Sequence, residues 1–327
     1  MPIIDFHNHF YPPEYLDALR ADGSAVTVTV DERGNPRLHY PGDYNVAVRG
    51  HRDIEYRQRV LETEGVDTQV LTLTTPGTHV ERPERAAELA RLVNDAYAEI
   101  VRARAPRFTA LATLPLNDPV ASATELRRAM RELGLPGAML FSNVNGVALA
   151  DARFAPLYEE ADRLGAVLYI HPTAPVGVEA MTDYWLMPLV GFLFDTTLAA
   201  SKLVFSGTVE RYPRIRWVLG HLGGAIPYMA ERLDRGYHAF GECQAHLTRR
   251  PSELLRQFYF DTVNFDPRAL RLAVDFAGAD HVLAGSDYPH QIGSLRSMQE
   301  SIEQAQLTNE ERAGILGANA ARLLGLG

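Results

Sequence analysis

The sequence predicts an α/β protein built as a (β/α)8 TIM barrel. Over most of the 327 residues, short runs of β-branched and apolar residues alternate with longer segments of helical periodicity. Eight such short runs can be counted, the number that a closed barrel requires. Polar side chains follow several of these runs, as they do where barrel strands end at a shared cavity. A doubly wound open sheet with an extra strand remains an alternative, because it gives a similar alternation.

The expected strands are residues 2–6, 68–74, 108–114, 137–140, 166–170, 216–219, 257–261 and 282–284. The helical segments between them include residues 83–104, 119–132, 154–164, 225–237 and 267–276. Three of these five begin with proline, which is tolerated in a first helical turn. Residues 17–50 interrupt the alternation with two short runs around a turn, the pattern of a small hairpin inserted after the first strand. Because no repeat or flexible linker is visible, we expect a single catalytic barrel over residues 1–327 with 17–50 as an insertion.

Charge and composition exclude several kinds of partner. A net charge of −9 and a pI near 5.7 leave no basic excess for nucleic acid or an anionic membrane surface. The opening MPIIDFHNHF lacks the basic and apolar regions of a signal peptide, and we expect no later run to approach the ~20 apolar residues of a membrane span. Cys243 is the one cysteine, so the chain cannot form an internal disulfide or a thiolate zinc site. We expect a cytoplasmic protein with a small-molecule partner.

The first strand ends in an H-x-H motif. His7 and His9 follow the apolar run 2–6, and residues two apart on a strand point to the same face, so both imidazoles can reach one metal. Asn8, between them, should point away. By itself the motif is also compatible with two polar residues at a strand end.

Three later strand ends carry further candidates. His171 closes a strand in LYIHPTAP, where a buried imidazole requires a partner. His221 does the same in LGHLGGAIPY, where Gly223 and Gly224 allow a tight turn. Asp287, in LAGSDYPH, can ligate a metal or accept a proton, although a helix N-cap is the alternative. Together the strand ends predict one metal centre, whose imidazoles and carboxylate suit zinc, manganese or iron(II) and argue against calcium.

These motifs resemble those of the amidohydrolase-2 branch of the amidohydrolase superfamily. The resemblance is carried by D-x-H-x-H at residues 5–9, IHP at 170–172, HLGG at 221–224 and GSDYP at 285–289. It covers nearly the whole chain and is greatest with the metal-dependent decarboxylases related to aminocarboxymuconate semialdehyde decarboxylase. It implies a TIM barrel and a non-oxidative decarboxylase of an unsaturated or aromatic carboxylic acid.

The resemblance also implies a role for each residue of the centre. The metal ligands fall on His7, His9, His171 and Asp287, and the unligated histidine that activates the metal's water falls on His221. A benzoate-type version of the reaction instead uses Asp287 to protonate the ring carbon. Relatives that act on benzoates often carry glutamate in place of the first histidine, so His7 favours zinc as the divalent metal.

Substrate contacts are implied at four further positions. Arg49 and Arg232 match arginines that bind substrate carboxylates, the second of them in the neighbouring subunit's site, which implies a homodimer. A plain surface charge is the alternative for Arg49. Trp185 is placed to line a pocket for a flat ring, and His290 stands where the muconate enzyme has an aromatic residue.

Two other functions compete with decarboxylation. The same metal, water and His221 suffice for a hydrolase or hydratase acting on a ring-cleavage product or a lactone. A barrel with a purely structural metal is the non-enzymatic alternative, and it predicts the loss of a ligand or of the water-activating group. All five positions are filled.

Overall fold

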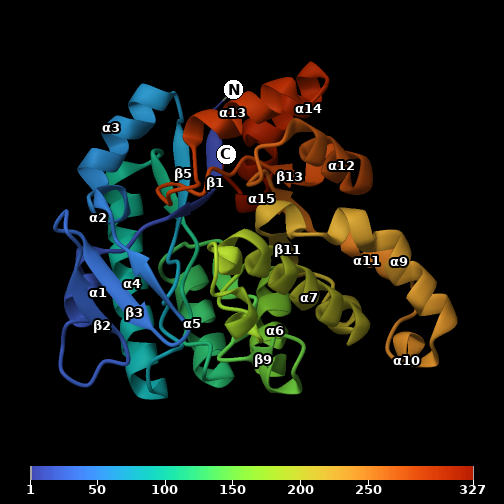
Figure 1. The fold of residues 1–327 in the computed structure, drawn as a ribbon, viewed down its shortest axis with the longest axis horizontal. Helices are drawn as coiled ribbons and strands as arrows, with labels where there is room; N and C mark the ends of the chain where they lie inside the picture. The colour runs from blue at the N-terminus through green and yellow to red at the C-terminus, as the bar shows by residue number, and fades with distance from the viewer. Residues whose placement is uncertain (1, 327) are drawn as a thin grey trace.

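The computed structural model describes residues 2–326 (Figure 1), and its centre is a barrel of eight parallel strands. The strands are β1 (Ile4–His9), β5 (Thr68–Thr72), β6 (Phe108–Ala110), β7 (Gly137–Phe141), β10 (Val167–His171), β11 (Arg216–Leu219), β12 (Tyr259–Asp261) and β13 (Val282–Leu283). They pair in two sheets with the orders β1-β5-β6 and β13-β12-β11-β10-β7.

Backbone hydrogen bonds beyond the regular ladders close these two sheets into a ring. The amide of Ala112, just past β6, donates to the carbonyl of Gly137 in β7 at 2.9 Å. At the other junction the amide of Phe6 in β1 donates to the carbonyl of Ala284, just past β13, at 2.7 Å. The predicted (β/α)8 barrel is therefore confirmed, and the open-sheet alternative is excluded.

Helices cover the outside of the ring, as the alternating pattern predicts. The main ones are α3 (Ile54–Glu64), α4 (Pro83–Arg104), α5 (Pro119–Arg131), α6 (Ala155–Leu164), α7 (Phe192–Phe205), α9 (Ile226–Ala239), α12 (Pro267–Ala277) and α13 (Leu295–Gln304). Shorter ones are α1 (Pro13–Ala18), α2 (Arg49–Arg52), α8 (Thr208–Arg211), α10 (Gly241–Gln244), α11 (Pro251–Leu255), α14 (Asn309–Ala313) and α15 (Asn319–Leu324). Prolines open α4, α5 and α12, where their missing N–H costs no hydrogen bond.

The barrel strands are almost entirely buried. Every residue of β1, β5, β7 and β10 is buried, because one face of each strand packs in the barrel interior and the other against helices. Val70, Leu140 and Ile170 are examples with no exposed surface. Polar side chains on these strands must therefore be partnered or functional.

The insertion after the first strand is larger than the predicted hairpin. Its strands β2 (Thr27–Val30), β3 (Pro36–Tyr40) and β4 (Asp43–Val46) form an antiparallel sheet in the order β2-β3-β4, drawn in blue at the edge of the barrel in Figure 1. The two predicted strands are present. The third was missed because its sequence, DYNV, is short and largely polar, and such strands have little signal of their own.

One helical segment contradicts the expectation that no stretch is long and apolar enough to cross a membrane. Met187–Phe205 has 19 residues and a mean hydropathy of 1.3, and 44% of the tested window is buried. The segment forms the crossover between β10 and β11 on the outside of the barrel. One side of it packs on the barrel, and several apolar side chains on it remain exposed.

Candidate metal centre

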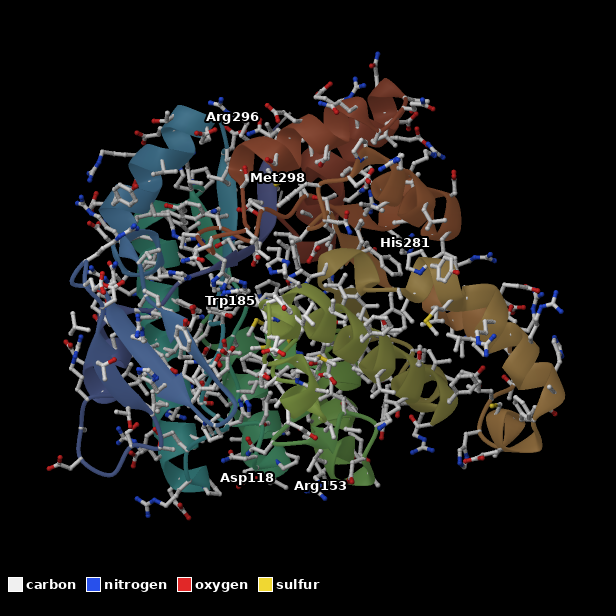
Figure 2. All side chains as sticks on the ribbon, in the orientation of Figure 1. Asp118, Arg153, Trp185, His281, Arg296 and Met298 are labelled. Atoms are coloured by element: carbon white, nitrogen blue, oxygen red, sulfur yellow. The ribbon has the colours of Figure 1, made fainter. Side chains whose placement is uncertain are left out.

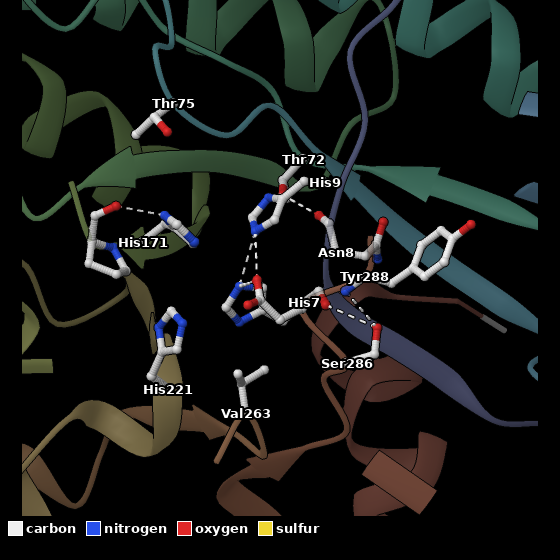
Figure 3. Close-up of polar contacts among 12 residues, drawn as sticks. His7, Asn8, His9, Thr72, Thr75, His171, His221, Val263, Ser286 and Tyr288 are labelled. Carbon is white, nitrogen blue, oxygen red and sulfur yellow. Dashed lines mark hydrogen bonds and ion pairs between the residues drawn. The ribbon is translucent and has the colours of Figure 1, made fainter. Parts of the chain in front are cut away.

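The four predicted metal ligands come together at one end of the barrel. His7, His9, His171 and Asp287 are all buried, and one ligand atom from each lies within 4.8 Å of the others. The Nε2 atoms of His7 and His9 are 3.2 Å apart, and each lies 3.3 Å from Oδ1 of Asp287. Figure 3 shows the imidazoles turned toward one another. These groups come from β1, from β10 and from the loop after β13.

Hydrogen bonds at the far side of each ring leave Nε2 free for a metal. Nδ1 of His7 meets the Asp261 carboxylate at 2.6 Å, and Nδ1 of His171 meets the carbonyl of Pro172 at 2.7 Å. The carboxylate and the carbonyl are acceptors, so each Nδ1 donates its N–H and Nε2 is the nitrogen that remains for a metal. Nδ1 of His9 faces the Thr72 hydroxyl at 3.2 Å, which itself donates to a backbone carbonyl.

Unpartnered buried atoms show that the residues fit a cation. Among the described residues, Nε2 of His171 and Oδ1 of Asp287 are buried and have no hydrogen-bond partner. Leaving such atoms unsatisfied is costly. A divalent ion between the four groups would satisfy both of them, and three imidazoles with one carboxylate form a set that zinc and similar transition metals accept.

The charges of the site also favour a bound cation. Burial lowers the pKa of His9 and His171 well below its ordinary value, so both rings are neutral and able to bind. Burial also disfavours a charged His7, but Asp261 and Asp287 outweigh it and raise the pKa of His7 to about 10. Burial alone would raise the pKa of Asp287, yet His290, His7 and His9 hold it well below the usual range. The centre thus keeps negative charge that a divalent cation can neutralise.

The H-x-H strand is held from behind by one buried arginine. Asn8 points away from the two histidines, as predicted, and accepts a hydrogen bond from Arg57 at 2.8 Å. Arg57 is fully buried and also donates to the carbonyl of His9 and to Oε1 of Gln69. The register of β1 against β5 shifts between Asp5 and Asn8, a bulge of the kind that re-aims side chains near functional sites.

His221 lies beside the four ligands without being one of them. Its ring centroid is 4.9 Å from that of His7 and 5.6 Å from that of His171, and its Nδ1 has no partner among the described residues. Burial lowers the pKa of His221 to about 4, so the ring is neutral and can accept a proton.

Two site residues adopt backbone conformations that are rare outside glycine. His221 has φ +55° and Asp287 has φ +57°. Left-handed conformations of such residues cost free energy and cluster at functional sites. Gly224, also at positive φ, lies where an added Cβ would meet the Leu193 carbonyl at 2.1 Å, so the turn after His221 requires glycine.

The four predicted substrate residues differ from one another in their exposure and in their neighbours. His290 is half-buried, with its ring centroid 4.9 Å from that of His9. Trp185 is 61% exposed and lies near Tyr44 of β4, close to the middle of the view in Figure 2. Arg49 points to solvent and pairs with Asp53 at 2.8 Å, as its surface-charge interpretation predicts. Arg232 is exposed on α9.

Sequence reasoning missed three buried polar residues. His51 and His79 lie outside the strand ends that the sequence singles out, yet both are buried, and neither ring nitrogen of His51 has a partner among the described residues. The His51 ring is 4.9 Å from that of His290. Asp261 was also missed, although it ends a barrel strand just as His171 does, and the same strand-end rule could have found it.

Comparisons with known proteins agree with this geometry. The amidohydrolase family matches residues 4–326. The chain is 34% identical to the 2-amino-3-carboxymuconate-6-semialdehyde decarboxylase of Dictyostelium discoideum, over 99% of this chain and 91% of the relative. The solved structure of 5-carboxyvanillate decarboxylase from Sphingomonas paucimobilis has a TM-score of 0.87 at 28% identity and covers 100% of this chain and 99% of its own.

A further solved relative was determined with a metal. The dihydroxybenzoic acid decarboxylase of Polaromonas sp. JS666, with bound manganese and the inhibitor 2-nitroresorcinol, has a TM-score of 0.84 at 27% identity and covers 99% of this chain and 97% of its own. Fold and site together define a barrel enzyme with a divalent-metal centre. The chain belongs to the amidohydrolase family.

Proposed function

We propose that this protein is a metal-dependent, non-oxidative decarboxylase of an unsaturated or aromatic carboxylic acid. The observation that carries the proposal is the buried centre of three imidazoles and one carboxylate with the neutral, unligated His221 beside it. The chain that holds this centre is similar along its whole length to decarboxylases of the same family.

The reaction replaces a carboxylate with a proton. The bond between the substrate carbon and its carboxylate breaks, the electron pair remains on that carbon, carbon dioxide leaves, and a proton is added. The divalent metal, when bound, orients the carboxylate, stabilises negative charge and lowers the pKa of water. His221 is a neutral base able to take a proton, and Asp287 is the alternative carrier of the proton that the carbon receives.

Zinc is our proposal for the metal, with manganese or iron as alternatives. The ligands His7, His9 and His171 are all neutral nitrogen donors once His7 gives up its proton, and imidazole-rich centres suit zinc. The manganese in the Polaromonas relative shows that this fold also accepts a harder ion in that protein.

The substrate contacts are proposed from position. His290 lies beside the proposed ligand His9 and Trp185 is exposed, so a flat acid could extend from the centre past His290 toward Trp185. Arg49 could reach a substrate carboxylate only after leaving Asp53. Arg232 is proposed to contact the substrate in the site of a second subunit.

We propose a cytoplasmic homodimer that forms through the outer faces of the Met187–Phe205 segment and of α9. Val190, Phe194 and Leu198 recur every four residues and are 38%, 56% and 48% exposed. Tyr228 is 83% exposed and lies one helical turn before Arg232. Apolar side chains in such a row favour a protein partner, and a second copy placed on them would cover Arg232. Each copy is proposed to be one domain over residues 1–327.

A panel of acids tests the proposal and separates it from the hydrolase or hydratase. Aminocarboxymuconate, hydroxybenzoates and ring-cleavage acids would be incubated with the metal-loaded protein, and the products analysed by mass spectrometry. Decarboxylation gives a product lighter by one carbon dioxide, whereas hydration gives one heavier by one water. The His221→Asn variant is the matched control, which should bind metal but lose turnover. Products that all keep their carboxylates would refute the decarboxylase.

A further inference from the structure

Asp261 contacts both His7 of the metal centre and the backbone of His221. It is the last residue of β12, and its side chain has no exposed surface. A buried carboxylate is costly unless it is fully hydrogen-bonded. The partners that satisfy it therefore indicate its role.

The two oxygens of this carboxylate serve two different parts of the site. Oδ2 accepts from Nδ1 of His7 at 2.6 Å and from the Tyr169 hydroxyl at 3.2 Å. Oδ1 accepts from the backbone amides of His221 at 2.8 Å and of Val263 at 3.0 Å. One rigid carboxylate thus contacts a metal ligand through one oxygen and the backbone of the water-activating candidate through the other.

The contact with His7 determines how that ring can bind. Because the carboxylate accepts a hydrogen bond, Nδ1 keeps its proton and Nε2 presents its lone pair to the centre. Partners of this kind also increase the basicity of a ligating imidazole and fix its orientation.

The contact with His221 holds an unfavourable turn in place. His221 and Leu222 have φ +55° and +52°, a conformation that side-chain-bearing residues rarely adopt. The Asp261 acceptor holds the amide at the start of this turn. The direction of the His221 ring, which no described hydrogen bond fixes at Nδ1, then depends on the backbone that Asp261 holds.

We propose that Asp261 is a positioning residue that couples metal binding at His7 to the placement of His221. It touches neither the metal nor the substrate. The part of the inference that concerns His221 rests on the proposed function, whereas the part that concerns His7 requires only the metal centre. Asp261 thus acts on both the proposed metal ligand His7 and the proposed base His221.

The substitution Asp261→Asn probes this dual role because an amide cannot replace both oxygens. If its oxygen faces His7, its NH2 group meets the donating amides of His221 and Val263. If its oxygen faces those amides, its NH2 group meets Nδ1 of His7 and disfavours the tautomer that binds metal. Asp261→Ala removes both contacts. Asp234→Asn is the matched control, because Asp234 is also a buried carboxylate but accepts from Ser252 on α11, outside the metal centre.

Two quantities are measured for each variant: zinc affinity, by competition with a chromogenic chelator, and kcat and KM at saturating zinc with the best acid of the panel. We expect Asp261→Asn to lose about tenfold or more in zinc affinity or in kcat, and Asp261→Ala to lose both, the loss of affinity being about 10–100-fold. KM should stay near the wild-type value, because Asp261 does not contact substrate. Asp234→Asn should keep wild-type affinity and kcat even where its melting temperature falls.

Asp261→Asn with unchanged affinity and unchanged kcat would overturn the inference, as would Asp261→Ala that keeps either one. A purely structural role would lower the melting temperature alone. If no acid is decarboxylated by the wild type, the proposed function fails separately. The zinc affinities then still decide whether Asp261 acts on His7.

Discussion

The Nε2 atoms of His7 and His9 face each other at 3.2 Å in the barrel interior, with the Asp287 carboxylate 3.3 Å from both. Two lone pairs directed at the same point repel, and only a proton or a cation between them makes the arrangement favourable. This arrangement of the three side chains is the structural basis of the metal centre.

Removing a ligand should remove the metal. Asp287→Ala and His171→Ala are each expected to weaken binding by more than the roughly 10–100-fold that changes in supporting residues cause, since each deletes a donor atom that has no other partner. Elemental analysis of purified variants measures this. His281→Ala is the control, because His281 is partly exposed and lies outside the centre. Full occupancy in both ligand variants would rule out the ligand assignment.

Metal binding should release a proton, and affinity should rise with pH. In the metal-free protein Asp261 and Asp287 raise the pKa of His7 to about 10, so His7 carries a proton at neutral pH that the metal must displace. One displaced proton corresponds to roughly tenfold in apparent affinity per pH unit, up to about pH 10. Calorimetry in two buffers of different ionisation enthalpy counts the protons released. Binding without proton release would contradict the raised pKa.

Arg57 should be a major contributor to stability. Its guanidinium is buried, donates to Asn8, Gln69 and the carbonyl of His9, and lies 4.9 Å from the ring centroid of Tyr288. Arg57→Met leaves these acceptors unpartnered and is expected to lower the free energy of unfolding by roughly 3–5 kcal/mol. Urea denaturation of the metal-free protein measures the change. Arg59→Met, on the exposed face of the same helix, should stay within about 0.5 kcal/mol; equal effects would show that Arg57 has no special role.

The proposed dimer can be broken at its apolar row. Phe194→Glu places a charge in that row and should yield monomers in sedimentation velocity, whereas Val120→Glu, at a position 65% exposed on α5, should not. A dimer that survives Phe194→Glu would place the interface elsewhere.

Mixing experiments test whether Arg232 serves the partner's site. Arg232→Ala and Asp287→Ala should each be inactive alone. A mixed dimer has one site with an intact Asp287 and a partner that supplies an intact Arg232, so mixing should restore activity. Mixtures no more active than their components would show that Arg232 acts within its own subunit or not at all.

Much of this architecture could be predicted because its causes are local in the sequence. Buried parallel strands require apolar runs, and the polar residues that end them are conspicuous, as at His171 and Asp287. The predicted run 108–114 extends past the observed strand, which ends at Ala110, because the amides of Leu111 and Ala112 still bond to neighbouring strands beyond that end. The apolar Met187–Phe205 segment was overlooked because Asp195 and Lys202 interrupt it, although neither prevents a long apolar helix.

What could not be predicted depends on contacts between distant segments. Nothing local marks His51 as buried, since its burial results from packing against Tyr11 and His290. The role of Asp261 depends on its contact with His7, 254 positions away in the sequence.

The most direct test of the account measures carbon dioxide release as a function of metal occupancy in one preparation. The substrate is an acid of the panel that the protein decarboxylates. Protein stripped by a chelator would be reloaded stepwise with zinc, and carbon dioxide and bound zinc measured at each step. The account predicts that release is absent from the stripped protein and rises in proportion to occupancy, up to one metal per subunit. Carbon dioxide released equally well by the metal-free protein would contradict it.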